Sequence, residues 1–202
     1  VPAAQKLDRT AATSDPPRPA SPPDHPPEPR MSNPEITEIK RIFLSRLDAL
    51  SHILDVAEQH LDLATALQER LAPDMFPLGT QIAFACNQPR GFAQWSAGNP
   101  VENLGRDVDS VAMARSHIAQ TKELVSGITA SDAKLDEDKR IGLGPGRHCV
   151  LPARQYVSEY LTPNLYFHIT TTYAILRKLG APLGKADYMS FLGPHVRTEG
   201  DA

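Results

Sequence analysis

The sequence predicts an all-α protein, an up-and-down four-helix bundle with one short β-hairpin before the last helix. Apolar residues recur every three or four positions in four long segments, which is the spacing of amphipathic helices. Prolines and glycines mark the breaks between these segments. The 202-residue chain is long enough for one such domain and its core.

The first 31 residues differ in composition from the rest. They contain three Pro-Pro pairs and almost no large apolar side chains. Such a segment cannot bury enough apolar surface to offset the entropy lost on ordering, so we expect a disordered leader over residues 1–31. Met31 is a candidate start, and a proline-rich docking segment is the alternative. The bundle domain is expected over residues 32–192, with a flexible tail over 193–202.

The first long helix has the clearest signal. Ser32, Pro34 and Glu35 match a capping box in which Ser32 is the N-cap. A stripe of apolar residues follows, which predicts one buried helix face. The stripe consists of Ile36, Ile39, Phe43, Leu47, Leu50, Leu54, Ala57 and Leu61.

The second long helix is expected to follow a short helical turn at residues 62–71. Asp74 is its candidate N-cap, and the apolar pattern continues to Trp95. Pro89 falls inside this pattern and is expected to kink the helix or to end its first half near Gln88.

Two further helices complete the bundle. The third is expected over residues 107–126. A Gly-Pro-Gly turn within residues 141–151 predicts the hairpin. The fourth helix is expected over residues 153–179, with a bend at Pro163 and a stop at Gly180.

The last helix carries the most informative polar residues. Asn164, His168 and Thr172 recur every four positions, so they share one helix face. Polar groups on an apolar helix need partners when they are buried. They either line a ligand pocket or form a satisfied network in the core. For the pocket, we expect Asp74 and Asn87 to lie nearby.

The pattern for a metal or a nucleophile is weaker. A zinc or nickel site needs three or four converging ligands, and the sequence has no His-x3-His or Cys-x2-Cys spacing. His168 is the candidate ligand, joined by Cys86 and by His52 or His60 only if packing brings them together. Cys86 and Cys149 are too few for a disulfide framework, although a single bridge between them stays open.

Charge and hydropathy exclude several classes. The formal net charge is −3 and the basic residues are dispersed, so no nucleic-acid partner is expected. No apolar run approaches the roughly 20 residues of a membrane span, and we expect a cytoplasmic protein. A helix-turn-helix at residues 62–88 is the least favoured alternative, because no basic recognition helix is present.

Four motifs together resemble the DUF1993 family, a family of unknown function among the DinB-like four-helix bundles. They are residues 71–78 (LAPDMFPL), 163–168 (PNLYFH), 173–177 (YAILR) and 182–185 (PLGK). The resemblance covers about residues 36–190. It implies a DinB-like bundle, a possible homodimer, and a divalent metal held by one histidine of the second helix and a His-x3-His pair of the last.

This sequence departs from that ligand pattern. His168 matches the first histidine of the pair, Thr172 occupies the second place, and Asn87 or Gln88 stands where the second-helix histidine is expected. The leading hypothesis is therefore a small-ligand pocket with a degenerate metal site. A metal- or thiol-dependent transferase, with His168 and Cys86 or His60 as ligands, is the alternative.

Overall fold

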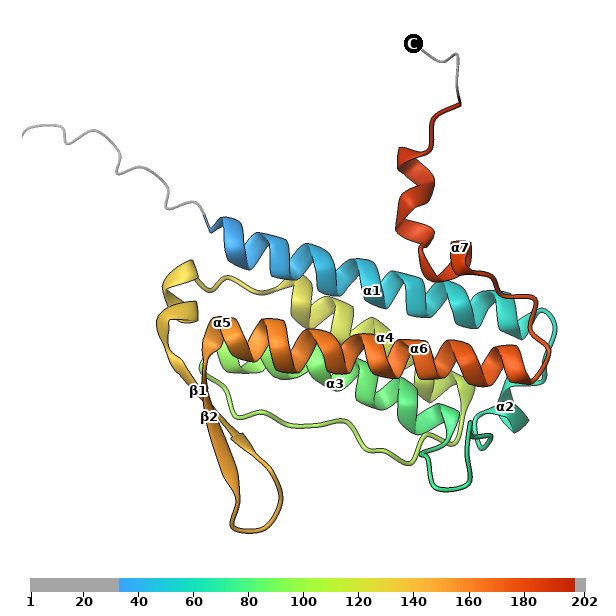
Figure 1. Cartoon of the computed structure of the whole chain (residues 1–202), viewed down its shortest axis with the longest axis horizontal. Helices are drawn as coiled ribbons and strands as arrows, with labels where there is room; N and C mark the ends of the chain where they lie inside the picture. Colours follow the sequence, from blue (N-terminus) through green and yellow to red (C-terminus); the bar gives the residue numbers. More distant parts are fainter. Residues whose placement is uncertain (1–32, 199–202) are drawn as a thin grey trace, which may run out of the picture. The chain divides into compact units, whose positions relative to one another are not determined.

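The computed structural model describes residues 33–198, which form a bundle of four long helices and a hairpin. Figure 1 shows their arrangement. The bundle consists of α1 (Pro34–Glu58), α3 (Leu78–Ser96), α4 (Val111–Ser126) and a last segment made of α5 (Ala153–Gln155), the π-helical η2 (Tyr156–Leu161) and α6 (Thr162–Lys178). The hairpin pairs β1 (Asp138–Gly142) antiparallel with β2 (His148–Pro152). The short elements are α2 (Leu63–Ala66), η1 (Asp132–Asp136), α7 (Lys185–Tyr188) and η3 (Ser190–His195).

The predicted bundle, with a hairpin before its last helix, is confirmed. The leader expected over residues 1–31 lies outside the described residues. At the other end, η3 crosses the boundary at residue 192 where the tail was expected to begin. Within the described part of the chain, no helix is both long and apolar enough to cross a membrane.

The predicted up-and-down order of the helices was wrong, because the segment 97–110 runs back along α3 and the helices do not simply alternate in direction (Figure 1). Asn87 Oδ1 accepts a hydrogen bond from the backbone N–H of Leu104 at 2.8 Å. Nearer the start of α3, Thr80 Oγ1 donates to the carbonyl of Arg106 at 2.8 Å. This crossover returns the chain to the beginning of α3, so α3 and α4 run in the same direction. Long crossovers of this kind occur in several bundle families.

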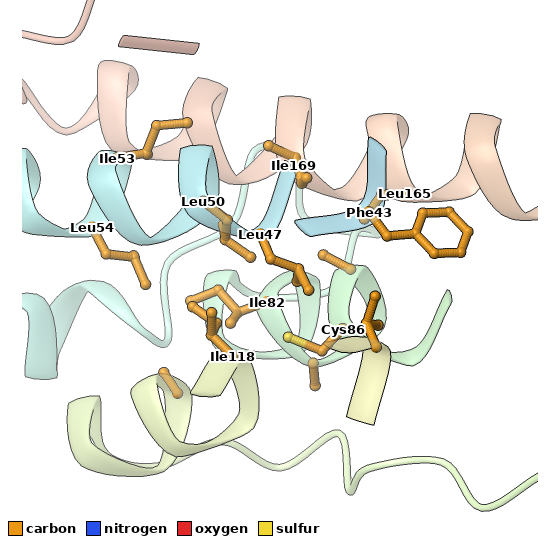
Figure 2. Packing of buried hydrophobic residues seen from close by; sticks show 14 of the residues in the cluster. Phe43, Leu47, Leu50, Ile53, Leu54, Ile82, Cys86, Ile118, Leu165 and Ile169 are labelled. Carbon is orange, nitrogen blue, oxygen red and sulfur yellow. The ribbon is translucent and has the colours of Figure 1, made fainter. Parts of the chain in front are cut away.

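One apolar core joins the four long helices (Figure 2). The apolar stripe of α1 faces side chains of α3, α4 and α6, which explains its spacing of threes and fours. Burial of each large aliphatic side chain stabilises the fold by about 1.5–3 kcal/mol. The buried residues labelled in Figure 2 are Phe43, Leu47, Leu50, Ile53, Leu54, Ile82, Cys86, Ile118, Leu165 and Ile169.

The start of α1 is capped from a distant segment. Asn33 is the N-cap residue, and its Oδ1 accepts from the backbone N–H of Asp132 at 3.1 Å. In return, the Asp132 carboxylate accepts from the backbone N–H groups of Glu35 and Ile36 at 3.3 and 3.0 Å. The N-cap is therefore Asn33 and not the predicted Ser32, which lies outside the described residues, and the N–H groups of Glu35 and Ile36 find their acceptor in η1.

The start and the middle of α3 also differ from expectation. Pro77 is the N-cap residue, so the prediction of Asp74 in that role was wrong. The helix continues through Pro89, so the first of its halves does not end near Gln88, which was one of the two outcomes predicted for this proline. An interior proline ordinarily costs about 3 kcal/mol of helix stability. Here Pro89 is buried, and the packing of α3 on both sides overrides the local preference.

The other helix ends follow recognisable local chemistry. α4 begins at Val111 rather than near 107, because Ser110 is its N-cap and accepts from the backbone N–H of Met113. The π-helical η2 lies immediately before Pro163, where the sequence predicts a bend. The last helix ends as predicted, since Gly180 adopts a φ of 103°.

Candidate functional site

A cleft of about 400 Å³ lies between α3, the η2–α6 segment and the hairpin. It brings together three of the five residues proposed from the sequence, namely Asn87, Asn164 and His168. The groups on its walls that matter for recognition are Asn87, Gln88, Gly91, Lys139, Tyr156, Tyr160, Asn164 and His168.

His168 is held by a buried amide. Its Nδ1 lies 2.8 Å from Oε1 of Gln81, a residue of α3 that is only 2% exposed. Gln81 Nε2 donates to the carbonyl of Phe76 at 3.1 Å, which fixes the orientation of the amide. Because the amide oxygen only accepts, His168 carries its proton on Nδ1. Its Nε2 is therefore the ring nitrogen that keeps a lone pair.

Aromatic rings surround the imidazole of His168. Phe84 and Phe167 contact it edge to face, each with a centroid separation of 5.3 Å. Burial lowers the pKa of His168 from 6.5 to about 4, because a charged imidazolium would lose its hydration. The ring is thus neutral at physiological pH and presents an acceptor.

The two predicted amides already make backbone contacts. Asn87 Oδ1 accepts from Leu104, as described above, and holds the crossover. Asn164 Nδ2 donates to the carbonyl of Tyr160 at 2.6 Å. Gln88 makes the same kind of bond one helix away, because its Nε2 donates to the carbonyl of Phe84 at 3.1 Å. In both donating amides the side-chain oxygen has no hydrogen-bond partner among the described residues.

Thr172 and Asp74 lie elsewhere. Thr172 is fully buried, and its Oγ1 has no hydrogen-bond partner among the described residues. Two helical turns separate it from Asn164, about 12 Å at 1.5 Å per residue, so one face of the helix extends beyond the cleft. Asp74 is exposed on the loop before α3 and does not line the cleft.

The hairpin supplies a cation that the sequence reasoning missed. Lys139 Nζ lies 5.5 Å from the ring centre of Trp95 and 5.8 Å from that of Tyr156. Burial and the neighbouring charge of Lys134 lower the pKa of Lys139. The alternation of side chains along a strand could have identified Lys139 from the sequence, because it places this residue on the same face as the buried Ile141.

Gln81 was also missed. It is a long amide beside Leu78 and Ile82 in an otherwise apolar stretch, and an amide in such a position needs a buried partner. That signal does not identify the partner, because His168 lies 87 residues further along the chain.

The residues around His168 do not fit the three-ligand metal centre implied by the resemblance. One ring nitrogen faces an amide oxygen, and the flanking side chains are phenyl rings. Over residues 33–198, no three His, Cys, Asp or Glu side chains converge as a metal site would require. His52 pairs instead with Asp187 at 2.9 Å.

Neither cysteine supports thiol chemistry in the cleft. Cys86 is fully buried, and burial raises the pKa of its thiol to about 12. Cys149 lies half-buried on β2. Both are free, so the bridge that the sequence left open does not form.

Two other cavities are slightly larger, but no histidine lines either of them. One of about 470 Å³ lies between the ends of α3 and α4, and it contains both Arg90 and Glu123. The other, about 490 Å³, lies beside the start of α1, where Arg154 is already paired with Glu35 and Asp136. Neither cavity therefore offers an acceptor equivalent to the imidazole of His168.

Comparisons with known proteins agree with this architecture. The profile of a family described as "Domain of unknown function (DUF1993)" matches residues 38–189. A crystal structure of a DinB family member protein from Shewanella denitrificans is similar, with 30% sequence identity and a TM-score of 0.65. The match covers 78% of this chain and 93% of that one. A search of curated proteins found no match.

Proposed function

This chain belongs to the DUF1993 family and has a DinB-like fold, and on that premise we propose that it binds a small organic ligand in the cleft between α3, α6 and the hairpin. The cleft volume of about 400 Å³ is within the range of small-molecule sites.

The hydrogen bond between Gln81 and His168 carries this proposal. A buried amide that fixes one ring nitrogen leaves the other as an oriented acceptor, which suits a ligand hydroxyl, amine or thiol. A pKa of about 4 makes His168 a poor general base near neutral pH, since efficient proton transfer needs a pKa close to the working pH. Ligand recognition is therefore favoured over proton-transfer catalysis.

The proposal does not include a metal centre, because the donor set around His168 does not fit one. Elemental analysis of the full chain by mass spectrometry checks this, beside a His168→Ala variant. About one metal per chain that disappears in the variant would overturn this part of the proposal. An equal, substoichiometric metal content in both proteins is the expected result.

The cleft itself is tested with a neutral fluorescent probe, N-phenyl-1-naphthylamine. Gly91 lines the cleft, and a Cβ there would lie 3.4 Å from Val101 Cγ1 and 4.0 Å from the Tyr156 hydroxyl. A Gly91→Gln side chain should therefore enter the cleft. Gly105→Gln is the matched control, because a Cβ at Gly105 meets nothing within 4 Å among the described residues.

We expect the wild type and Gly105→Gln to bind the probe equally, and Gly91→Gln to bind it at least about tenfold more weakly. His168→Phe should also weaken binding, since it removes the acceptor for the amine N–H of the probe. Equal affinity in all four proteins, with unchanged thermal unfolding, would overturn the proposed function.

A homodimer and a cytoplasmic location are also proposed. Phe76 and Phe167 are 46% and 55% exposed and flank the Phe84–His168 pair, which supports a self-association surface. Sedimentation of wild type and a Phe167→Ser variant tests it, and a monomeric wild type at micromolar concentration would contradict it. Two free thiols support a reducing compartment.

A further inference from the structure

We infer that the ligand of this cleft is an organic anion whose negative group pairs with Lys139, and this inference rests on the proposed function. The charge of the cleft wall is the first observation. Lys139 and Arg140 border the cleft, and none of the described residues lining it is an aspartate or a glutamate.

The ammonium group of Lys139 has no counter-charge among the residues that the structure describes. Within residues 33–198 it forms no ion pair, whereas the neighbouring Lys134 pairs with Glu137 at 2.6 Å. Asp138 is adjacent in sequence, but successive side chains of a strand point to opposite faces, and Asp138 is exposed. A carboxylate, phosphate or sulfonate in the cleft would supply the missing partner.

Aromatic rings hold this cation at the cleft wall. Lys139 Nζ contacts the faces of Trp95 and Tyr156, and Tyr156 stacks on Tyr160 with a centroid separation of 5.6 Å. A half-buried ammonium without a carboxylate is costly, because the rings replace only part of its hydration. The lowered pKa of Lys139 has the same cause. An anionic ligand removes that cost, and the adjacent tyrosine pair offers a surface for a flat group.

The helical side of the cleft carries hydrogen-bond acceptors, whereas the hairpin side carries positive charge. The amides of Gln88 and Asn164 donate to backbone carbonyls of their own helices, so their oxygens remain as acceptors. Together with Nε2 of His168, they are acceptors on the helical side of a cleft whose hairpin side carries Lys139 and Arg140. This arrangement fits a ligand with a negative group at the hairpin and a hydroxyl, amine or thiol at α6, in the manner of a hydroxy, amino or mercapto acid.

The experiment compares two probes that differ in one charged group. The anion 8-anilinonaphthalene-1-sulfonate has the skeleton of N-phenyl-1-naphthylamine plus a sulfonate. Binding of both is measured by fluorescence titration with the full chain, Lys139→Met and Lys139→Arg. Lys185→Met is the control, because Lys185 is exposed on α7 and does not line the cleft.

We expect the anionic probe to bind the wild type about tenfold or more tightly than the neutral one. Lys139→Met should abolish this preference by weakening only the anionic probe, and Lys139→Arg should restore it. Lys185→Met should behave as the wild type. An unchanged ratio of the two affinities in Lys139→Met would overturn the inference while leaving the cleft itself intact. Binding of both probes unaffected by Gly91→Gln would instead reject the proposed function.

Discussion

Nδ1 of His168 and Oε1 of Gln81 are 2.8 Å apart, and this pair joins the last helix of the bundle to the second. The two residues come from α6 and α3, and other side chains of both helices line the cleft beside His168. Because Gln81 is itself held by the carbonyl of Phe76, the pair sets both the tautomer and the direction of the imidazole.

Replacing Gln81 with glutamate should change the titration of His168. A carboxylate beside Nδ1 favours the imidazolium, so the pKa of His168 should rise from about 4 by one unit or more. Nitrogen NMR shifts of the imidazole measure this directly and also report the Nδ1–H tautomer of the wild type. Gln120→Glu, on the exposed face of α4, is the control that should leave His168 unchanged. An Nε2–H tautomer in the wild type would contradict the assignment.

The depressed pKa of His168 also makes stability depend on pH. The unfolded chain takes up the proton near pH 6.5 and the folded chain only near pH 4, so stability falls as the pH drops between these values. Above pH 7 the ring is neutral in both states and contributes nothing to this dependence. Since the ring is part-exposed, we expect the loss between pH 7 and pH 5 to be about 1 kcal/mol greater in the wild type than in His168→Gln.

Urea unfolding at the two pH values measures this difference. His117 must be considered too, because burial lowers its pKa and it adds a loss of the same sign to both proteins. Parallel pH profiles for wild type and His168→Gln would show that His168 is as easily protonated in the fold as in the unfolded chain.

The distant cap of α1 should be worth as much as a local one. Asp132→Ala removes the acceptor of the Glu35 and Ile36 N–H groups and should lower the free energy of unfolding by about 1–2 kcal/mol. Asp138→Ala, on the exposed face of β1, should change it by less than about 0.5 kcal/mol. Chemical denaturation measures both variants. Equal losses of unfolding free energy in the two would contradict a stabilising role of Asp132 at the start of α1.

The periodic features were predictable from the sequence, because they depend on local spacing. The stripe of α1, the hairpin and the glycine stop at Gly180 were all found in this way. Helical spacing also placed Asn164 and His168 on one face, and both line the cleft. The same spacing did not show that the cleft ends before it reaches Thr172.

The features that the sequence did not predict are those that depend on tertiary packing. Gln81 and Lys139 come from α3 and β1, and nothing in their local sequence specifies that Gln81 contacts His168 or that Lys139 lines the same cleft as His168. The direction of α4 could not be predicted either, because backbone groups of the segment 97–110 bind side chains of α3 rather than forming a regular element. For the same reason the sequence did not show that Asn87, which lines the cleft, also holds the crossover through its amide oxygen.

The two cysteines should react very differently. Cys86 is buried in the core with a pKa near 12, so almost none of it is thiolate at neutral pH. Cys149 is partly accessible on β2. A disulfide reagent such as 5,5′-dithiobis(2-nitrobenzoate) should therefore modify one thiol per native chain and two in denaturant. Cys149→Ser should abolish the native reaction, and rapid modification of two native thiols would contradict the burial of Cys86.

Asn87 offers a test of how the crossover supports the cleft. Asn87→Leu deletes the acceptor of the Leu104 N–H and should cost about 1–3 kcal/mol, because that backbone group then lacks its partner. Asn87→Asp keeps an oxygen in place and should cost less. Hydrogen exchange at Leu104 should accelerate in Asn87→Leu and remain close to wild type in Asn87→Asp.

The same two variants separate a structural role of Asn87 from a direct role in binding. Asn87 is 8% exposed and its oxygen is engaged, so a ligand in the cleft meets mainly its amide nitrogen. If Asn87 acts through the crossover, Asn87→Asp should bind N-phenyl-1-naphthylamine like the wild type and Asn87→Leu should bind it more weakly. Weakened binding in Asn87→Asp with unchanged exchange at Leu104 would instead place the amide nitrogen in contact with the ligand.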